Sequence, residues 1–247
     1  MLGAGRLSLI ASDVSIYDPY WSSVVLLMGF ENNLTDSSSA NQSVTAGGSI
    51  YFSTSTVKFG TYSITLQGAA ALNKSYLNIT NTSSFYFGTG DFTIETWAYI
   101  PSGTYWGSNN VSVMDITQKQ NGVNGGPSMF GLTTSSGSTV NAYKIFVYDN
   151  TAMGNVSSTA VLGGNTWNHI VTGRQGGTFY LGTNGTLQVA GTSTKNWFPY
   201  NVKIKNDGYS ENDYFVNYDE FRVTSGVWRY SGSTSTYTVP TAQFPRQ

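Results

Sequence analysis

The sequence contains no cysteine, only one histidine and few charged residues. Asp, Glu, Lys and Arg together make up 10% of its 247 residues. The lack of cysteine excludes disulfides and thiolate metal sites, and a single histidine argues against a zinc site. The net charge of −1 and the lack of any basic run give no electrostatic basis for binding nucleic acid or an anionic membrane surface. We therefore expect neither of these partners.

Long apolar runs and helical periodicity are also missing. No apolar stretch approaches the ~18 residues that are needed to cross a bilayer. Instead, short apolar or alternating segments recur between clusters of Gly, Asn, Ser and Thr, which is typical of strands and turns. The expected strands are 23–30, 55–60, 62–68, 75–79, 91–100, 111–117, 128–134, 142–149, 168–174, 178–191, 202–206 and 218–227. Within 178–191, Asn184-Gly185 predicts a tight hairpin turn.

About a dozen short strands without helices predict an all-β protein, folded as an antiparallel two-sheet sandwich. Segment 91–100 alternates, so that Phe92 faces one side and Trp97 the other. We expect Trp97, or its neighbours on the side of Phe92, to lie inside the sandwich.

No composition shift divides the chain internally, but the first residues precede the first strong strand. We therefore expect an N-terminal arm at 1–20 and a single domain at 21–247. The arm has alternating apolar residues and is too short to form its own core. We expect Leu7, Leu9 and Ile10 to pack against a neighbouring subunit and anchor the protein there.

Four segments in order suggest a family: "LLMGFENNLTDSS" (26–38), "GTGDFTIETWAYIP" (88–101), "GNTWNHIVTGRQGGTFYLGTNGTLQ" (164–188) and "YDEFRVTSGVWRYSG...YTVPTAQFP" (218–245). Together they resemble laminin-G-like, concanavalin A-like jelly rolls. The resemblance implies the jelly-roll form of the two-sheet sandwich. Such jelly rolls host lectins, hydrolases, adhesion modules and decorating proteins, so the fold alone does not define the function.

The two ends of the domain, 18–31 and 219–245, resemble single-domain laminin-G-like proteins of tailed bacteriophages. This resemblance implies a non-enzymatic virion structural protein, either a capsid decoration or a tail, fibre or baseplate component. Its expected partners are major capsid or tail subunits and further copies of itself, and its expected location is the virion. The alternative is a lectin-like adhesin that binds host-surface glycans. An enzyme acting on polysaccharide is the third reading.

Catalysis finds little support among the acidic residues. Glycoside hydrolases use two carboxylates that flank the cleaved bond. Among the four glutamates, only Glu95 has a second acid on the same strand face, namely Asp91. We assign no catalytic residue. The lone His169 shows no Ser-His-Asp arrangement, and we expect a structural role with a ring nitrogen bonded to the backbone.

Charge gathers in "NYDEFRVTSGVWRY" (217–230). Strict alternation would place Asp219 on the core side with Phe221, and Glu220 with Arg222 on the solvent side. A carboxylate on an apolar face needs a partner.

In the resembling family, the Asp of the final "DxxRV" strand ligates a structural calcium together with an acid on the first strand and a glycine turn. The matching positions are Glu31, Asp219 and Gly60. We expect that the protein requires no cofactor, and a structural calcium ion is the one we consider. The alternative is that Asp219 accepts backbone hydrogen bonds or meets Lys58.

Aromatic residues in loops could stack on sugars. Three loop clusters, "TYWG", "NWFPY" and "NDGY", supply the candidate glycan-binding residues Tyr105, Trp106, Trp197 and Tyr209.

Overall fold

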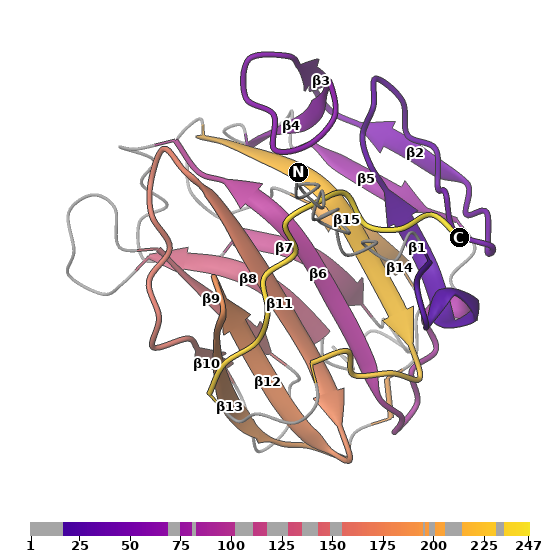
Figure 1. Cartoon of the computed structure of the whole chain (residues 1–247), viewed down its shortest axis with the longest axis vertical. Helices are drawn as coiled ribbons and strands as arrows, with labels where there is room; N and C mark the ends of the chain where they lie inside the picture. Colours follow the sequence, from indigo (N-terminus) through magenta and orange to yellow (C-terminus); the bar gives the residue numbers. More distant parts are fainter. Residues whose placement is uncertain are drawn as a thin grey trace, which may run out of the picture.

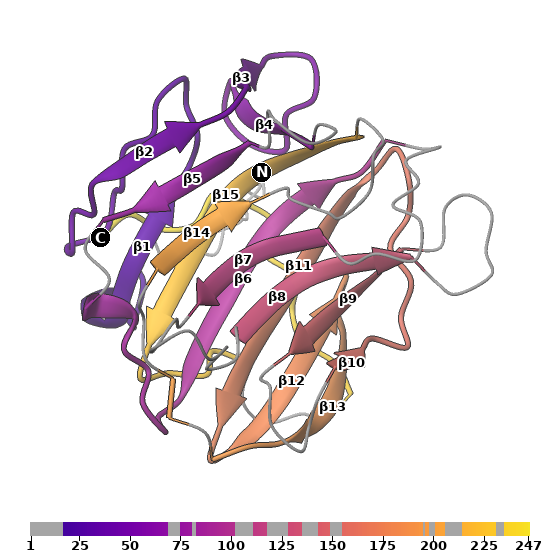
Figure 2. The same cartoon turned by 180° about the vertical axis from the view of Figure 1, so that it is seen from behind.

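The computed structural model describes residues 17–68, 75–80, 83–101, 111–117, 128–134, 143–148, 155–194, 196–197, 201–205, 214–230 and 235–247. Their strands form two antiparallel sheets that are stacked as a sandwich (Figures 1 and 2). Among these residues there are short 3-10 turns, η1 (Trp21–Ser23) and η2 (Ser83–Phe85), and no α-helix. Within this part of the chain no helix has the length and hydropathy to span a membrane.

The first sheet has eight strands and faces the viewer in Figure 1. Its order is β13 (Thr186–Thr192), β12 (Thr178–Thr183), β11 (Trp167–Gln175), β6 (Phe92–Tyr99), β15 (Tyr214–Ser225), β4 (Ser63–Gly68) and β3 (Ile50–Ser53), and β1 (Val24–Met28) also pairs with β15. The second sheet faces the viewer in Figure 2, with the order β10 (Asn155–Ser157), β9 (Tyr143–Tyr148), β8 (Ser128–Thr134), β7 (Val111–Thr117), β14 (Asn201–Lys205), β5 (Tyr76–Ile79) and β2 (Val44–Gly47).

The main core lies between the sheets. Phe92, Ile94 and Ala98 of β6 lie in it, together with Ile170 of β11 and Val223 of β15. The expected side of β6 is therefore confirmed. Trp97 lies on the outer face of the same strand, where it is only 5% exposed.

The hairpin at Asn184-Gly185 is also confirmed, since both residues have positive φ, 47° and 89°. The strand predicted at 55–60 is wrong. This segment forms no ladder, because its N–H groups at Lys58 and Phe59 bond to the carboxylate of Asp219 instead of a neighbouring strand. Strands β2, β3 and β10 were not expected from the sequence.

A β-bulge in β15 changes the facing of the charged segment. The pairing with β6 shifts between Asp219, which lies opposite Trp97, and Arg222, which lies opposite Glu95. Glu220 sits in the bulge with φ 50°. One extra residue restarts the alternation, so Asp219 shares the outer face with Trp97 instead of the core side with Phe221. The predicted facing is therefore wrong.

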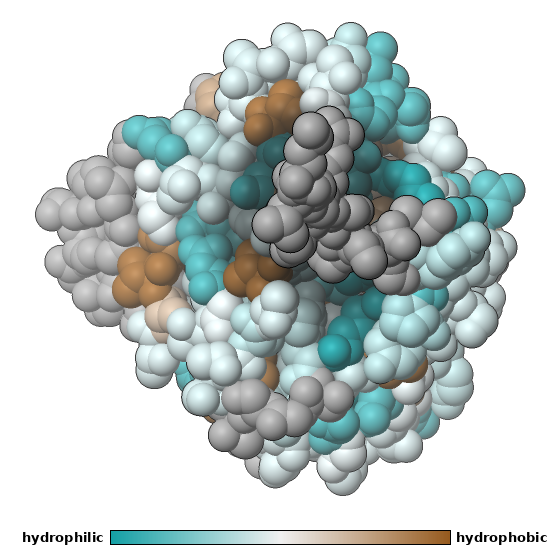
Figure 3. All heavy atoms as spheres, in the orientation of Figure 1, coloured by the Kyte–Doolittle hydropathy of each residue, from teal (hydrophilic) through white to brown (hydrophobic). Residues whose placement is uncertain are grey.

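Glu220 and Arg222 were expected on a solvent side, and this is also wrong. Their exposed fractions are 0% and 6%. The cover comes from the chain's last segment, 235–247, which runs across the outer face of the first sheet (Figure 1). It begins beside the β12–β13 turn, where Tyr237 N–H bonds to Gly185 O, and ends where Asp18 N–H bonds to Gln247 O. Outside the grey atoms, hydrophobic residues on this face are separate spots among polar ones (Figure 3).

Candidate functional site

The candidate site lies where β15 exchanges one neighbour for another. Its residues 214–218 pair with β4, and its residues 221–224 pair with β1. The bulge at Glu220 falls between these two pairings. At this junction the loop after β1, the turn before β4 and the C-terminal segment come together.

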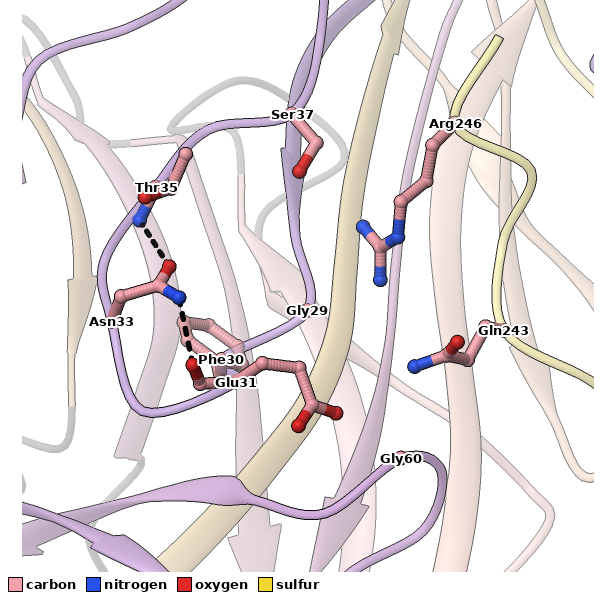
Figure 4. A pocket seen from close by; sticks show the side chains of 9 residues that line it. All are labelled: Gly29, Phe30, Glu31, Asn33, Thr35, Ser37, Gly60, Gln243 and Arg246. Atoms are coloured by element: carbon pink, nitrogen blue, oxygen red, sulfur yellow. Dashed lines mark hydrogen bonds between the residues drawn. The ribbon is translucent and has the colours of Figure 1, made fainter.

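These three segments line an open pocket of about 440 Å³, which we call the tail pocket (Figure 4). Its lining residues are Gly29, Phe30, Glu31, Asn33, Thr35, Ser37, Gly60, Gln243 and Arg246. The volume is in the range of small-molecule sites. Eight of the nine residues are polar or glycine, and Phe30 reaches the pocket from the core.

The first wall is the loop after β1, and a buried carboxylate holds its shape. Asp36 accepts N–H groups from Leu27, Ser38 and Gln42 at 2.7–2.9 Å, and also the Ser38 hydroxyl at 2.8 Å. Asn33 adds two bonds within the loop, donating to Glu31 O and accepting from Thr35 N–H. The loop is therefore fixed before any ligand binds, which lowers the entropy cost of binding.

The second wall is the C-terminal segment, and the bulge residue Glu220 holds it. Its carboxylate accepts Phe244 N–H at 3.0 Å and Arg246 Nη2 at 2.6 Å. Phe244 is 3% exposed and packs against Val24 and Leu27, with the Arg222 guanidinium 3.8 Å from its ring centroid. The bulge thus has a use: it turns a buried carboxylate toward the segment that closes the pocket.

The third wall is the turn before β4, which meets Glu31. The Glu31 carboxylate accepts N–H groups from Thr61 and Tyr62 at 3.0–3.2 Å. Gly60 has φ +70°, and a Cβ there would lie 1.7 Å from Glu31 Oε1. Only glycine leaves space for the carboxylate in this position.

Several polar groups in the tail pocket have no partner within the described residues. Arg246 Nη1 is buried and makes no hydrogen bond. The Ser37 hydroxyl and the Gln243 amide likewise take part in none of the hydrogen bonds there. In Figure 4, these three groups and the Glu31 carboxylate point toward a common space. Unpaired polar groups around a preformed cavity are the usual composition of a binding site.

The predicted calcium residues are divided by this geometry. Glu31 and Gly60 line the tail pocket, whereas Asp219 lies on the other side of the same turn. Asp219 Oδ2 accepts Lys58 and Phe59 N–H at 2.9 and 3.1 Å, which is the alternative raised from the sequence. Its Oδ1 is buried and unpaired.

Calcium takes six to eight oxygen ligands. Within the described residues, no group of three or more His, Cys, Asp or Glu is placed to hold a metal. Three of the four carboxylate oxygens of Glu31 and Asp219 already accept N–H bonds, so the donor set does not form a calcium shell as it stands.

The calcium site therefore remains a prediction, and melting curves test it. A calcium ion that binds only the folded chain would raise the melting temperature in calcium chloride relative to EDTA. Asp219→Asn would abolish the rise, and Glu95→Gln, a carboxylate change outside the turn, would leave it in place. Superimposed wild-type curves in calcium and EDTA would reject the site.

Glu95 does not face a cleft. It is 0% exposed, and its carboxylate bonds to Arg222 at 2.8 and 2.9 Å and to the Tyr230 hydroxyl. Asp91 shares its strand face and accepts Gly176 N–H at 2.8 Å. Burial alone would raise the pKa of Glu95, but Arg222, His169 and Arg229 together outweigh it and hold that pKa well below its ordinary value. The carboxylate is an acceptor fixed within the fold.

His169 belongs to the same buried cluster. Its Nδ1 lies 3.0 Å from the Tyr237 hydroxyl and its Nε2 lies 3.4 Å from Glu95 Oε2. The ring therefore meets side chains, and the expected backbone partner is wrong. Burial lowers the pKa of His169, which keeps the imidazole neutral.

Trp197 does not form the exposed aromatic platform that was expected. It is 4% exposed and packs in the main core against Phe92 and Phe179. The other glycan candidates, Tyr105, Trp106 and Tyr209, lie outside the described residues. So do the anchoring candidates Leu7, Leu9 and Ile10.

Residues 71–229 match the Laminin G 3 family, described as the concanavalin A-like lectin/glucanases superfamily. The match covers more than half of the chain, so the chain belongs to this family. The fold is thus the lectin-like jelly roll that the sequence resemblance implied. No curated protein matches the chain.

Solved structures with the same fold include bacterial toxins. Botulinum neurotoxin type C, from a study of its dependence on two ganglioside molecules for cell entry, has a TM-score of 0.62 at 15% identity. The binding domain of Paraclostridial Mosquitocidal Protein 1 has a TM-score of 0.64 at 13% identity. The binding domain of botulinum neurotoxin DC, in complex with rat synaptotagmin II, has a TM-score of 0.61 at 15% identity.

These alignments cover 84%, 85% and 84% of this chain, and 49%, 50% and 49% of the respective structures. The chain thus spans about half the length of these structures. At such identities the likeness establishes the fold alone.

Proposed function

We propose that the chain is a non-enzymatic, lectin-like adhesin domain that binds a host-surface glycan in the tail pocket. The observation that carries the proposal is the set of unpaired polar groups on preformed walls: Ser37, Gln243 and the free nitrogen of Arg246. Sugars are bound by a few well-placed polar side chains that exchange hydrogen bonds with their hydroxyls. Figure 4 shows these groups pointing toward the same space.

Two further findings support a glycan as the ligand class. The family to which the chain belongs is described by its lectins and glucanases. Botulinum neurotoxin type C, which shares the fold, depends on two gangliosides for cell entry. For this chain, a glycan ligand is our proposal.

The proposal excludes an enzymatic role because the two candidate catalytic carboxylates are already hydrogen-bonded within the fold. Glu95 is enclosed by Arg222 and Tyr230, and Asp91 bonds to a backbone N–H. Neither can protonate a glycosidic oxygen or attack a sugar without breaking the bonds that fix it.

We place this binding domain on the virion of a tailed bacteriophage, with the bacterial surface as its target. The support is the resemblance of 18–31 and 219–245 to laminin-G-like proteins of such phages. A virion location also accounts for the proposed contacts with capsid or tail subunits and with other copies of the chain.

The glycan proposal predicts that the wild-type domain binds some members of a panel of immobilised bacterial and animal oligosaccharides. Gln243→Ala should weaken that binding about fivefold, because it removes one pocket hydrogen bond. Gln188→Ala is the matched control, since this glutamine lies on β13 at the opposite edge of the same sheet. It should bind as the wild type does.

Two results would contradict the proposal. One is the absence of binding to every glycan, or equal losses in the two alanine variants. The other is release of reducing sugar from a polysaccharide that disappears in Glu95→Gln, which would show an enzyme.

A further inference from the structure

We propose that the tail pocket selects sugars that carry a carboxylate, such as uronic or sialic acids, and that Arg246 binds the carboxylate. This inference rests on the proposed function, because it specifies the ligand class of the same site. It is drawn from the distribution of hydrogen-bond donors and acceptors along the pocket walls.

Only one of the two terminal nitrogens of the Arg246 guanidinium has a hydrogen-bond partner among the described residues. Nη2 donates to Glu220 Oε1 at 2.6 Å, and Nη1 is buried without a hydrogen bond in the described structure. Glu220 itself is 0% exposed and cannot turn away to solvent. A buried donor without an acceptor is destabilising, so an acceptor that reaches this nitrogen would form a favourable hydrogen bond.

Gly29 makes this placement of the guanidinium possible. A Cβ on Gly29 would lie 2.3 Å from Arg246 Nη2 and 3.1 Å from Glu220 Oε1. The chain therefore leaves out a side chain at the point where the cation packs against the loop. Glu220 holds the Nη2 side of the guanidinium, and the Arg246 side chain extends toward the pocket (Figure 4).

Two neutral donors also line the pocket, the Ser37 hydroxyl and the Gln243 amide, and neither has a partner among the described residues. The Gln243 nitrogen lies toward the Gly60 turn, 3.0 Å from where a Cβ on Gly60 would be. A charged donor that has neutral donors in the same pocket favours a ligand group that only accepts. A sugar carboxylate is such a group, and its hydrogen bonds to a guanidinium are about twice as strong as those between neutral groups.

The opposite end of the pocket has the reverse preference. Glu31 presents a carboxylate there, which accepts from Thr61 and Tyr62 and has lone pairs left for hydroxyl donors. A second anionic group at this end would be repelled. The two ends together select a ligand with one anionic group and several hydroxyls, which describes an acidic sugar better than a free anion or a neutral sugar.

The test compares acidic sugars with their uncharged counterparts by calorimetric titration. The probes are oligosaccharides that end in glucuronic or N-acetylneuraminic acid, the same compounds after reduction of the carboxyl group to an alcohol, and a sulfated oligosaccharide. We expect at least one acidic probe to bind about tenfold or more tightly than its reduced form.

Arg246→Lys is the decisive variant. Lysine keeps a positive charge beside Glu220 but cannot place a second nitrogen where Nη1 lies. It should reduce the affinity for the acidic probe about tenfold or more, and reduce the affinity for the reduced probe by a much smaller factor. Lys203→Gln, which removes a cation from β14 in the other sheet, should change neither. A melting curve of each variant verifies that it is folded.

The outcomes separate this inference from the proposed function. If the acidic and reduced probes bind equally and Arg246→Lys has no effect, the domain is a lectin but the carboxylate assignment is wrong. Binding of the sulfated probe alone would also overturn it. If no glycan of any kind binds, both proposals fail. An equal loss of all binding in Arg246→Lys, with a lowered melting temperature, would assign Arg246 to the fold and overturn its role in recognition.

Discussion

Replacement of Glu95 by alanine is expected to lower the free energy of unfolding by about 3–5 kcal/mol, the largest loss for any residue considered in this protein. The reason is the charge that the substitution leaves behind. Arg222 is 6% exposed, and without Glu95 its buried guanidinium would retain, among the described residues, only Asp18 at 3.0 Å as an ionic partner. Removing one member of a buried ion pair strands the other in a medium that solvates it poorly.

The cluster around Glu95 extends to the beginning and end of the described chain. Asp18 bonds to both Arg222 and Arg229, with distances of 2.8–3.0 Å. These contacts join the segment before β1 to β15 and to Arg229 just after it, and Asp18 N–H also bonds to Gln247 O at the end of the covering segment. Loss of Glu95 should therefore loosen the cover of the outer face as well as the pair itself.

Asp91→Ala is the matched control for Glu95→Ala. Asp91 precedes the same strand and faces the same side, but its carboxylate accepts one N–H from Gly176 near the surface. It should cost about 1 kcal/mol. Urea unfolding at pH 7 measures both. Equal losses of unfolding free energy in the two variants would show that the buried cluster contributes no more to stability than a surface hydrogen bond does.

The same cluster makes the stability of the protein depend on pH. Burial raises the pKa of Glu95, but Arg222, His169 and Arg229 together lower it further, so the folded-state pKa lies below the ordinary 4.5. A depressed carboxyl pKa contributes stability that is present above 4.5 and lost as the pH falls below it. Wild type should therefore lose stability between pH 4.5 and pH 2 more steeply than Glu95→Gln does.

The sandwich could be predicted from the sequence because its signals are local. Strands β7 and β8 have the expected bounds, and Asn184-Gly185 forms the expected turn. Each of these depends on alternation or turn chemistry within a few residues. The resemblance to laminin-G-like proteins added the topology, which local patterns cannot supply.

The site could not be predicted because it depends on contacts between distant segments. Its walls come from 29–37, Gly60 and 243–246, which are brought together only when β15 pairs with β1 and β4. The bulge at Glu220 leaves no mark in the alternating pattern, since a glutamate with positive φ is held there by Phe244 and Arg246. Strict alternation through the bulge assigned Asp219 to the wrong face, and it could not show that the C-terminal segment covers Arg222 on the outer face.

The second large effect is expected at Asp219, where replacement by asparagine should stabilise the protein at pH 8. The pKa of Asp219 is raised to about 7. Burial is the main cause, and the charges of Glu220 and Glu31 add to it, whereas the N–H bonds from Phe59 and Lys58 favour the charged form and oppose the rise. The ordinary value is 3.8. A raised carboxyl pKa contributes stability that is complete below 3.8 and is lost as the pH rises through 7.

Between pH 5 and pH 8 this loss amounts to about 2–3 kcal/mol, since each unit of pKa difference corresponds to about 1.4 kcal/mol. Asparagine resembles the protonated acid, and its Oδ1 can still accept the two N–H bonds. The variant should therefore match wild type below pH 3.8, and its advantage over wild type should grow by about 2–3 kcal/mol between pH 5 and pH 8. Because burial lowers the pKa of His169, this histidine gives wild type and variant the same opposite slope below pH 6.5. The difference between the two curves isolates Asp219. Urea unfolding in EDTA across this pH range, which keeps metal ions out of the comparison, measures it, and parallel curves would show that Asp219 is charged throughout.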